Sequence, residues 1–192
     1  MLAFAKILWV KSVTLDEHTF AYGRRDPSVR AREPRRAGDV FDLHCTPEDA
    51  ESLADPQSGD LLVLTQHDLA THLVQVIGDD VCPRPRRTIR PGTRDGRFSW
   101  QRTCSLIYLR DFEDAPSIQE AFGVPVDVSG GEVFFIPELA AIERSNFPRW
   151  AVQRRIAKAL EPDRTQVGLT PIKEGPLRRL ESGPGRVPKR PH

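Results

Sequence analysis

The sequence predicts an α+β fold in which β-strands form the centre and short helices flank them. The clearest signal is a β-hairpin, because residues 61–65 and 71–77 are rich in apolar and β-branched side chains and a polar stretch, residues 66–70, separates them. A Gly-Asp pair precedes the first run and another follows the second, so both ends of the hairpin carry a turn signal. Strand-like stretches and short helical stretches elsewhere complete the α+β pattern.

Four other stretches have strand character. Residues 2–13 are mostly apolar, include Trp9 and predict a strand in the middle of a sheet. Residues 39–45 alternate polar and apolar side chains, and residues 132–136 are apolar and aromatic. Residues 98–109 predict a strand whose alternation places one set of side chains on a single face: Phe98, Trp100, Arg102, Cys104, Leu106 and Tyr108.

Helices are expected at residues 46–55, 115–122, 137–144 and 149–160. Thr46 can cap the first of them, and Gly123 is suited to close the second. In the last one, Val152, Ile156 and Leu160 fall on one face, so this helix should pack on the sheet.

A length of 192 residues is sufficient for one domain with a proper core, and we expect that domain to span residues 1–160. From residue 161 on, the chain has six prolines, four glycines and few large apolar residues. This composition predicts a disordered basic tail over residues 161–192.

The cysteine pattern and the hydropathy indicate a soluble cytoplasmic protein. Cys45, Cys82 and Cys104 lie far apart and form no Cys-x-x-Cys pair, which argues against a disulfide framework and against a thiolate zinc site. The apolar N-terminal stretch has no basic region before it and no small-residue cleavage site after it. No apolar run approaches the roughly 20 residues of a membrane helix, so we expect no membrane contact.

The formal net charge of +1 hides a separation of the two signs along the chain. Residues 24–36 carry six arginines against two carboxylates, and residues 84–102 carry seven arginines against one. Residues 39–60 and 111–143 hold seven and eight carboxylates and neither Lys nor Arg. The chain therefore has two basic and two acidic blocks.

The basic blocks border the aromatic strands, and this combination is typical of nucleic-acid binding, where guanidinium groups pair with phosphates and aromatic faces stack on bases. Polar side chains of the hairpin could read a base edge. The candidate binding residues are Trp9, Arg24, Arg25, Gln66, Thr71, His72, Arg97, Phe98, Trp100, Arg102 and Tyr108. The alternatives are that the arginines only balance charge on a solvated surface and that the aromatic residues belong to the core.

Motifs for catalysis or cofactor binding do not appear in the sequence. It has no Walker-type loop and no Gly-x-Ser-x-Gly, and no carboxylate-histidine spacing matches a known ligand set. We therefore expect no cofactor, no metal and no catalytic residue. His72 remains available as a proton carrier in a less favoured hydrolase hypothesis.

The order of elements resembles the PUA-like superfamily, particularly its EVE-type domains. The resemblance covers residues 2–160 and depends most on the Gly-Asp-Leu-Leu-Val-Leu strand, its partner Thr-His-Leu-Val-Gln-Val, the first strand with Trp9-Val10 and the aromatic strand around Trp100. It implies a small, mixed and largely antiparallel β-barrel flanked by short helices that binds RNA or DNA and holds a modified base in an aromatic pocket. Trp9 and Trp100 would then be pocket walls, and the arginines of the two basic blocks would clamp the backbone.

Three functional hypotheses follow. The first is a non-catalytic nucleic-acid-binding module that recognises a modified base extruded from a duplex. The second is a protein-interaction or adaptor domain that uses the acidic blocks and the basic tail to bind a protein partner. The third is a nucleic-acid hydrolase acting through His72 and a nearby carboxylate.

Overall fold

A computed structural model of the chain describes residues 4–13, 37–85, 94–110 and 112–161. All of these belong to one compact unit, Met1–Pro162. The basic block at residues 24–36 and the predicted tail from residue 162 on lie outside the described residues.

The centre of the fold is a mixed sheet in the order β2-β6-β4-β3-β1-β7, with β5 paired to β6. β1 runs parallel to β3, and the other pairs are antiparallel. The strands are β1 (Ile7–Ser12), β2 (Val40–Cys45), β3 (Leu61–Gln66), β4 (Leu69–Val76), β5 (Cys82–Pro83), β6 (Trp100–Leu109) and β7 (Val133–Phe135).

The helices are short except for the last. The α-helices are α1 (Ala50–Ala54), α2 (Ile118–Phe122), α3 (Ala140–Ser145) and α4 (Arg149–Leu160). Short 3-10 turns are present at η1 (Phe4–Lys6), η4 (Arg94–Arg97) and η5 (Ile136–Glu138). The predicted α+β class is confirmed, and the predicted bounds of α4 agree with the structure.

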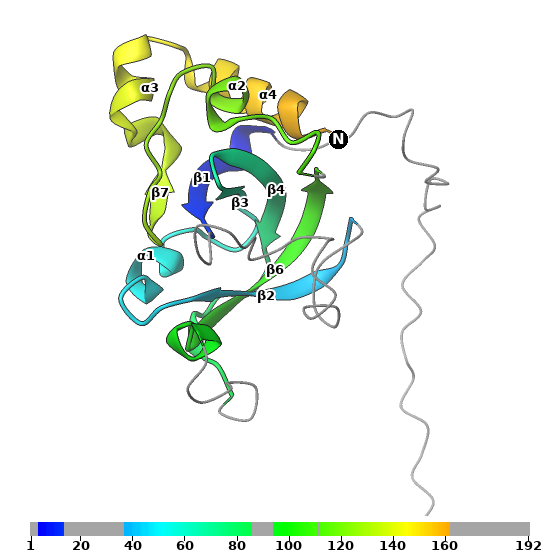
Figure 1. The fold of residues 1–192 in the computed structure, drawn as a ribbon, viewed down its shortest axis with the longest axis vertical. Helices are drawn as coiled ribbons and strands as arrows, with labels where there is room; N and C mark the ends of the chain where they lie inside the picture. Colours follow the sequence, from blue (N-terminus) through cyan, green and yellow to red (C-terminus); the bar gives the residue numbers. More distant parts are fainter. Residues whose placement is uncertain (1–3, 14–36, 86–93, 111, 162–192) are drawn as a thin grey trace, which may run out of the picture. The chain divides into compact units, whose positions relative to one another are not determined.

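The sheet curls so strongly that its two ends face one core (Figure 1). Phe41 of β2 and Val133 of β7, from opposite ends of the strand order, belong to the same buried cluster as Leu53 of α1. We call the sheet face that lines this cluster the inner face.

The curl is a half-barrel and not the closed barrel that the sequence led us to expect. On the open side of the half-barrel, α1 lies between β6 and β7 and is hydrogen-bonded to both. The guanidinium Nη1 of Arg102 on β6 donates to the carbonyl of Leu53. The hydroxyl of Ser52 accepts the backbone N–H of Val133 on β7 at 3.1 Å. β7, with three residues, is the last strand in the order at this end of the sheet.

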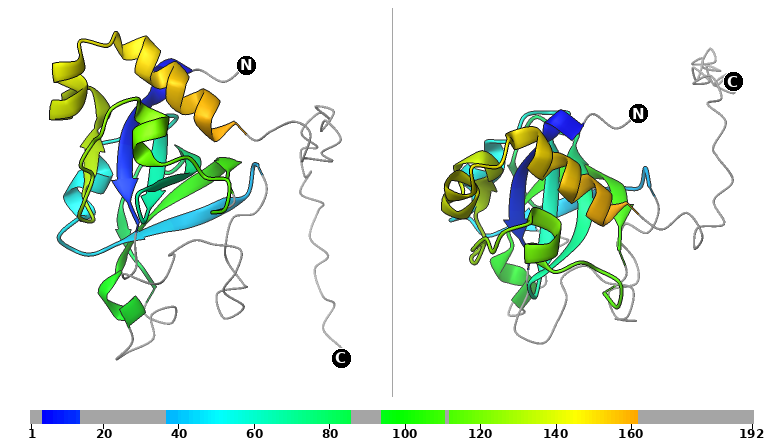
Figure 2. Two further views of the ribbon diagram at one scale, coloured as in Figure 1. Left: turned by 45° about the horizontal axis from the view of Figure 1, so that its top comes forward. Right: turned by 90° about the horizontal axis from the view of Figure 1, so that it is seen from above.

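The outer face of the sheet is covered by α2 and α4, which lie side by side in both views of Figure 2. Ile7 and Leu73 of the sheet pack in one cluster with Phe122 of α2 and with the buried face of α4. The buried amide of Gln153 on α4 donates to the carbonyls of Ala5 and Ile7, both at 3.1 Å. These bonds fix the rotation of α4 about its axis.

The β3–β4 hairpin turns more tightly than expected. Its strands reach Gln66 and Leu69, so only His67 and Asp68 form the loop, and both have positive φ angles, 48° and 63°. This is the geometry of a type I′ turn, which suits the twist of the two strands but favours Asn-Gly over the pair found here.

We expect Asp68→Gly to raise the free energy of unfolding by about 0.5 kcal/mol, because glycine adopts a positive φ without steric cost. Asp68→Ala is the matched control: it removes the same carboxylate but keeps a Cβ, so it should lower stability. Urea denaturation of the three proteins measures both changes. An alanine variant as stable as the glycine variant would contradict this account.

Candidate functional site

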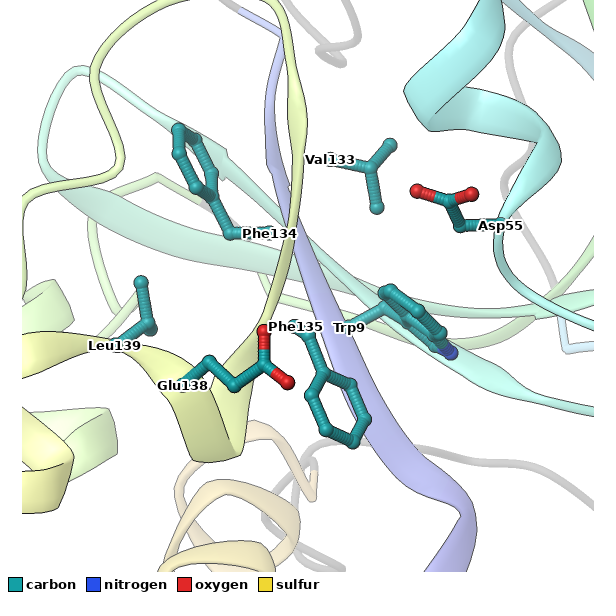
Figure 3. A pocket seen from close by; sticks show the side chains of 7 residues that line it. All are labelled: Trp9, Asp55, Val133, Phe134, Phe135, Glu138 and Leu139. Atoms are coloured by element: carbon teal, nitrogen blue, oxygen red, sulfur yellow. The ribbon is translucent and has the colours of Figure 1, made fainter.

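An open pocket of about 590 Å³ lies at the β7 end of the sheet (Figure 3). Its volume falls within the range of roughly 300–1,000 Å³ that is usual for small-molecule sites. β1, the end of α1, β7 and the segment that follows β7 supply its described lining: Trp9, Asp55, Val133, Phe134, Phe135, Glu138 and Leu139.

Two aromatic rings form one wall of the pocket because of strand register. Trp9 and Phe135 are direct partners in the antiparallel β1–β7 pair, so their side chains lie on the same face. The ring centroids are 4.9 Å apart and the planes are inclined by 49°. At this separation the rings touch, so a flat ligand stacks against the pair and not between its members.

The indole of Trp9 is held in place from the side. Its Nε1–H donates to Oδ2 of Asp60 at 3.0 Å, and the same oxygen accepts the backbone N–H of Gln57 at 2.9 Å. Asp60 thus joins the ring to the turn that precedes β3. Since the indole donor is already used, Trp9 offers a ligand its face.

The polar groups of the pocket are acceptors. Asp55 and Glu138, both exposed, are the charged side chains among the described lining residues. A described cation lies beside the aromatic wall: Cζ of Arg149 is 5.6 Å from the ring centroid of Phe135, within range of a cation–π contact. The pocket therefore suits a flat ligand with N–H donors or a positive charge and disfavours a phosphate group.

Strand register places four of the predicted site residues on the inner face. Trp9 is level with Leu62, Val74 and Leu106, and His72 lies in the neighbouring row with Lys11 and Leu64. Trp100 and Arg102 occupy alternate positions before Leu106 on β6. These side chains share one face, but of the four only Trp9 lines the described pocket.

Tyr108 departs from the predicted one-face pattern. Leu73 pairs with Tyr108 while the next residue, Val74, pairs with Leu106, so β6 has one extra residue, Ile107, at a bulge. The bulge shifts the alternation, and Tyr108 packs with the outer-face cluster while Trp100 packs with the inner-face cluster. The expectation that both rings line one face was therefore wrong.

The hairpin candidates Gln66, Thr71 and His72 are buried, with exposed fractions of 0–1%. The amide of Gln66 donates to the hydroxyl of Thr71 at 3.0 Å, and Nδ1 of His72 lies 2.8 Å from that hydroxyl oxygen. Burial lowers the pKa of His72 to about 3, so its imidazole is neutral at pH 7. A ligand reaches these groups only if the residues that cover them move.

The arginine candidates fall into different environments. Arg102 is buried, and besides Leu53 it hydrogen-bonds the carbonyl of Gly78 at 3.2 Å, so its described hydrogen bonds are to the protein itself. Arg97 is exposed in η4, and the neighbouring Phe98 is half-buried. Arg24 and Arg25 lie outside the described residues.

Sequence reasoning missed the residues that complete the pocket. Phe135, Asp55 and Glu138 belong to stretches that we interpreted as an acidic block and a last strand, without linking them to Trp9. The only available signal was the aromatic pair Phe134-Phe135 in a predicted strand, and the register against β1 was not visible.

Among the residues that the structure describes, no group of three or more His, Cys, Asp or Glu side chains is arranged to hold a metal ion. In the same part of the chain, no helix combines the length and apolar character needed to cross a membrane.

Comparison of the chain with protein-family models, with curated proteins and with solved structures found no match.

Burial of a neutral His72 makes stability depend on pH. Its pKa is about 6.5 in the unfolded chain and about 3 in the fold, so between these values the unfolded state binds a proton that the folded state does not. We expect the wild type to lose up to about 1.4 kcal/mol of stability per pH unit below 6.5 on this account. Comparing urea denaturation of the wild type and His72→Gln from pH 7 to pH 4 isolates this contribution.

The stability of the wild type relative to His72→Gln should fall as the pH falls. Two pH–stability curves that run parallel would show that His72 titrates normally in the fold.

Proposed function

We propose that this chain is a non-catalytic nucleic-acid-binding module of the PUA-like, EVE-like type that holds one base in the pocket beside Trp9. The observation that carries the proposal is the pairing of Trp9 and Phe135 in the wall of an open pocket whose polar lining consists of acceptors. A half-barrel of mixed strands with short helices is compatible with such a module.

The chemistry of the pocket favours a base over other parts of a nucleic acid. Aromatic faces stack on any base, and this contact contributes about 1–3 kcal/mol per base. The carboxylates of Asp55 and Glu138 can accept hydrogen bonds from exocyclic amino groups, as acidic side chains do with cytosine N4. They repel phosphates, so the base enters the pocket and its backbone stays outside.

The carboxylates of Asp55 and Glu138 favour bases that carry an exocyclic amino group. Adenine, cytosine and guanine carry an exocyclic amino group, while thymine and uracil do not. The pocket volume also leaves room for a substituent on the base. A flipped or single-stranded base with an amino group, modified or not, is therefore the proposed ligand.

Trp9→Ala should weaken binding of a single-stranded oligonucleotide by about 1–3 kcal/mol, because it removes the stacking face. Trp9→Phe keeps an aromatic face and should retain most of the affinity. Fluorescence anisotropy with labelled DNA and RNA, each with one modified or unmodified base at a central position, measures the effect. Equal affinity of the wild type and Trp9→Ala for every oligonucleotide would exclude a base in this pocket.

The same titration with Trp100→Ala tests whether Trp100 is a second wall, as the sequence suggests. A loss as large as that of Trp9→Ala would extend the site along the inner face. An unchanged affinity would confine the site to the described pocket.

The lining of the pocket also favours a second candidate. Aromatic rings combined with carboxylates are the usual surroundings of methylated ammonium groups, so a protein-interaction module that binds a methylated lysine is the alternative. Asp55→Asn with Glu138→Gln separates the two. The double variant should abolish binding of a trimethyllysine peptide, whereas a neutral base keeps its stacking contact and amide oxygens still accept its amino group.

A further inference from the structure

The outward side of α4 carries a stripe of aromatic and basic side chains. Trp150, Arg154 and Lys158 follow one another at intervals of four residues, so they lie on one side of the helix, about 6 Å apart along its axis. Phe147 precedes Trp150 by three residues, just before the helix begins. We call these four residues the α4 stripe.

The stripe is exposed because the opposite side of α4 is fixed in the core. Val152, Ile156 and Leu160 are buried in the outer-face cluster, and the amide of Gln153 is bonded to the backbone before and within β1. Trp150 is consequently 64% exposed and Phe147 47% exposed. Two large aromatic side chains three residues apart are thus open to water beside cations, and an exposed apolar patch with a polar rim is typical of a binding surface.

The charge of α4 selects an anionic partner. The helix carries Arg149, Arg154, Arg155 and Lys158 and no carboxylate, whereas the chain as a whole has a formal net charge of only +1. Arg155 donates to the carbonyl of Glu120 at 3.0 Å. Arg154 and Lys158 lie one and two turns from Trp150, so an aromatic face and two cations are presented together.

The start of α4 borders the pocket, and the stripe lies about 100–180° round the helix axis from that point. Arg149 lies against Phe135, which is part of the pocket wall, and Trp150 is the next residue of the helix. Because the pocket is lined by carboxylates, the phosphates on either side of a captured base lie outside the pocket. Arg149 borders the pocket and can receive the nearest phosphate, and the strand then turns round the start of α4 to reach Arg154 and Lys158 on the outward side.

We infer that the α4 stripe binds the single-stranded nucleic acid next to the captured base, an inference that rests on the proposed function. Trp150 stacks on a neighbouring base, and Arg154 and Lys158 pair with phosphates of the same strand. Phe147 extends the apolar platform at the start of the helix.

The test uses the full-length chain and a labelled 12-nucleotide single strand in which one central base carries an amino group. Trp150→Ala should lower the affinity about tenfold, in line with the loss of one stacked base, and Trp150→Phe should largely restore it. Arg154→Gln with Lys158→Gln should reduce the slope of log K against log salt concentration by roughly 1.4, because two phosphate contacts are lost. All of these side chains are exposed, and thermal unfolding should confirm that the variants fold like the wild type.

The pocket variant Trp9→Ala separates this inference from the proposed function. If the stripe variants lower the affinity of any single strand while Trp9→Ala alone removes the preference for one central base, both hold. If the stripe variants weaken binding and Trp9→Ala changes nothing, the α4 surface binds nucleic acid and the base pocket is wrong.

Unchanged affinity and salt slope in the stripe variants, with Trp9→Ala still impaired, would overturn the inference and leave the pocket intact. Two further probes identify other occupants of the stripe: vesicles containing phosphatidylserine and a polyglutamate peptide. Loss of binding to either of these, without loss of binding to the oligonucleotide, would also overturn it.

Discussion

The buried ammonium of Lys11 is the interaction on which the arrangement around the pocket depends. Lys11 is 2% exposed on the inner face, and its Nζ donates to the carbonyl of Gly131, which precedes β7. Burial lowers its pKa, while the nearby carboxylates of Asp49 and Glu132 favour the charged form. A buried cation needs such partners, so β7 is held beside β1, and Phe135 is held beside Trp9.

The pocket and α4 adjoin but carry opposite charges. The lining of the pocket offers carboxylates and aromatic faces, and α4, which meets it at Arg149, offers cations and an exposed indole. A ligand that fills both must have a flat, donor-bearing part and an anionic part joined by a short link. A nucleotide in a single strand has both parts, a flat base and an anionic phosphate.

The sequence was informative where local chemistry decides the structure. The hairpin, β6 and α4 could be predicted because their apolar periodicity is strong, and Gly123 closes α2 in the expected left-handed conformation. Long-range features could not be predicted. The bulge at Ile107 redirects Tyr108, and α1 fills the gap that a closed barrel would bridge, yet neither has a local signature. The pocket depends on the β1–β7 register, which pairs residues far apart in the chain.

The long sequence separation between β1 and β7 also affects the order in which the fold can form during synthesis. Lys11 and its partner Gly131 are 120 residues apart, so β1 leaves the ribosome long before β7 and α4 exist. During this interval the apolar residues of β1 have neither their antiparallel partner nor the helix that covers them. Contacts of such long range form late, although β1 can pair with its parallel neighbour β3 much earlier. The pocket can therefore form only once the chain has been translated as far as Leu139.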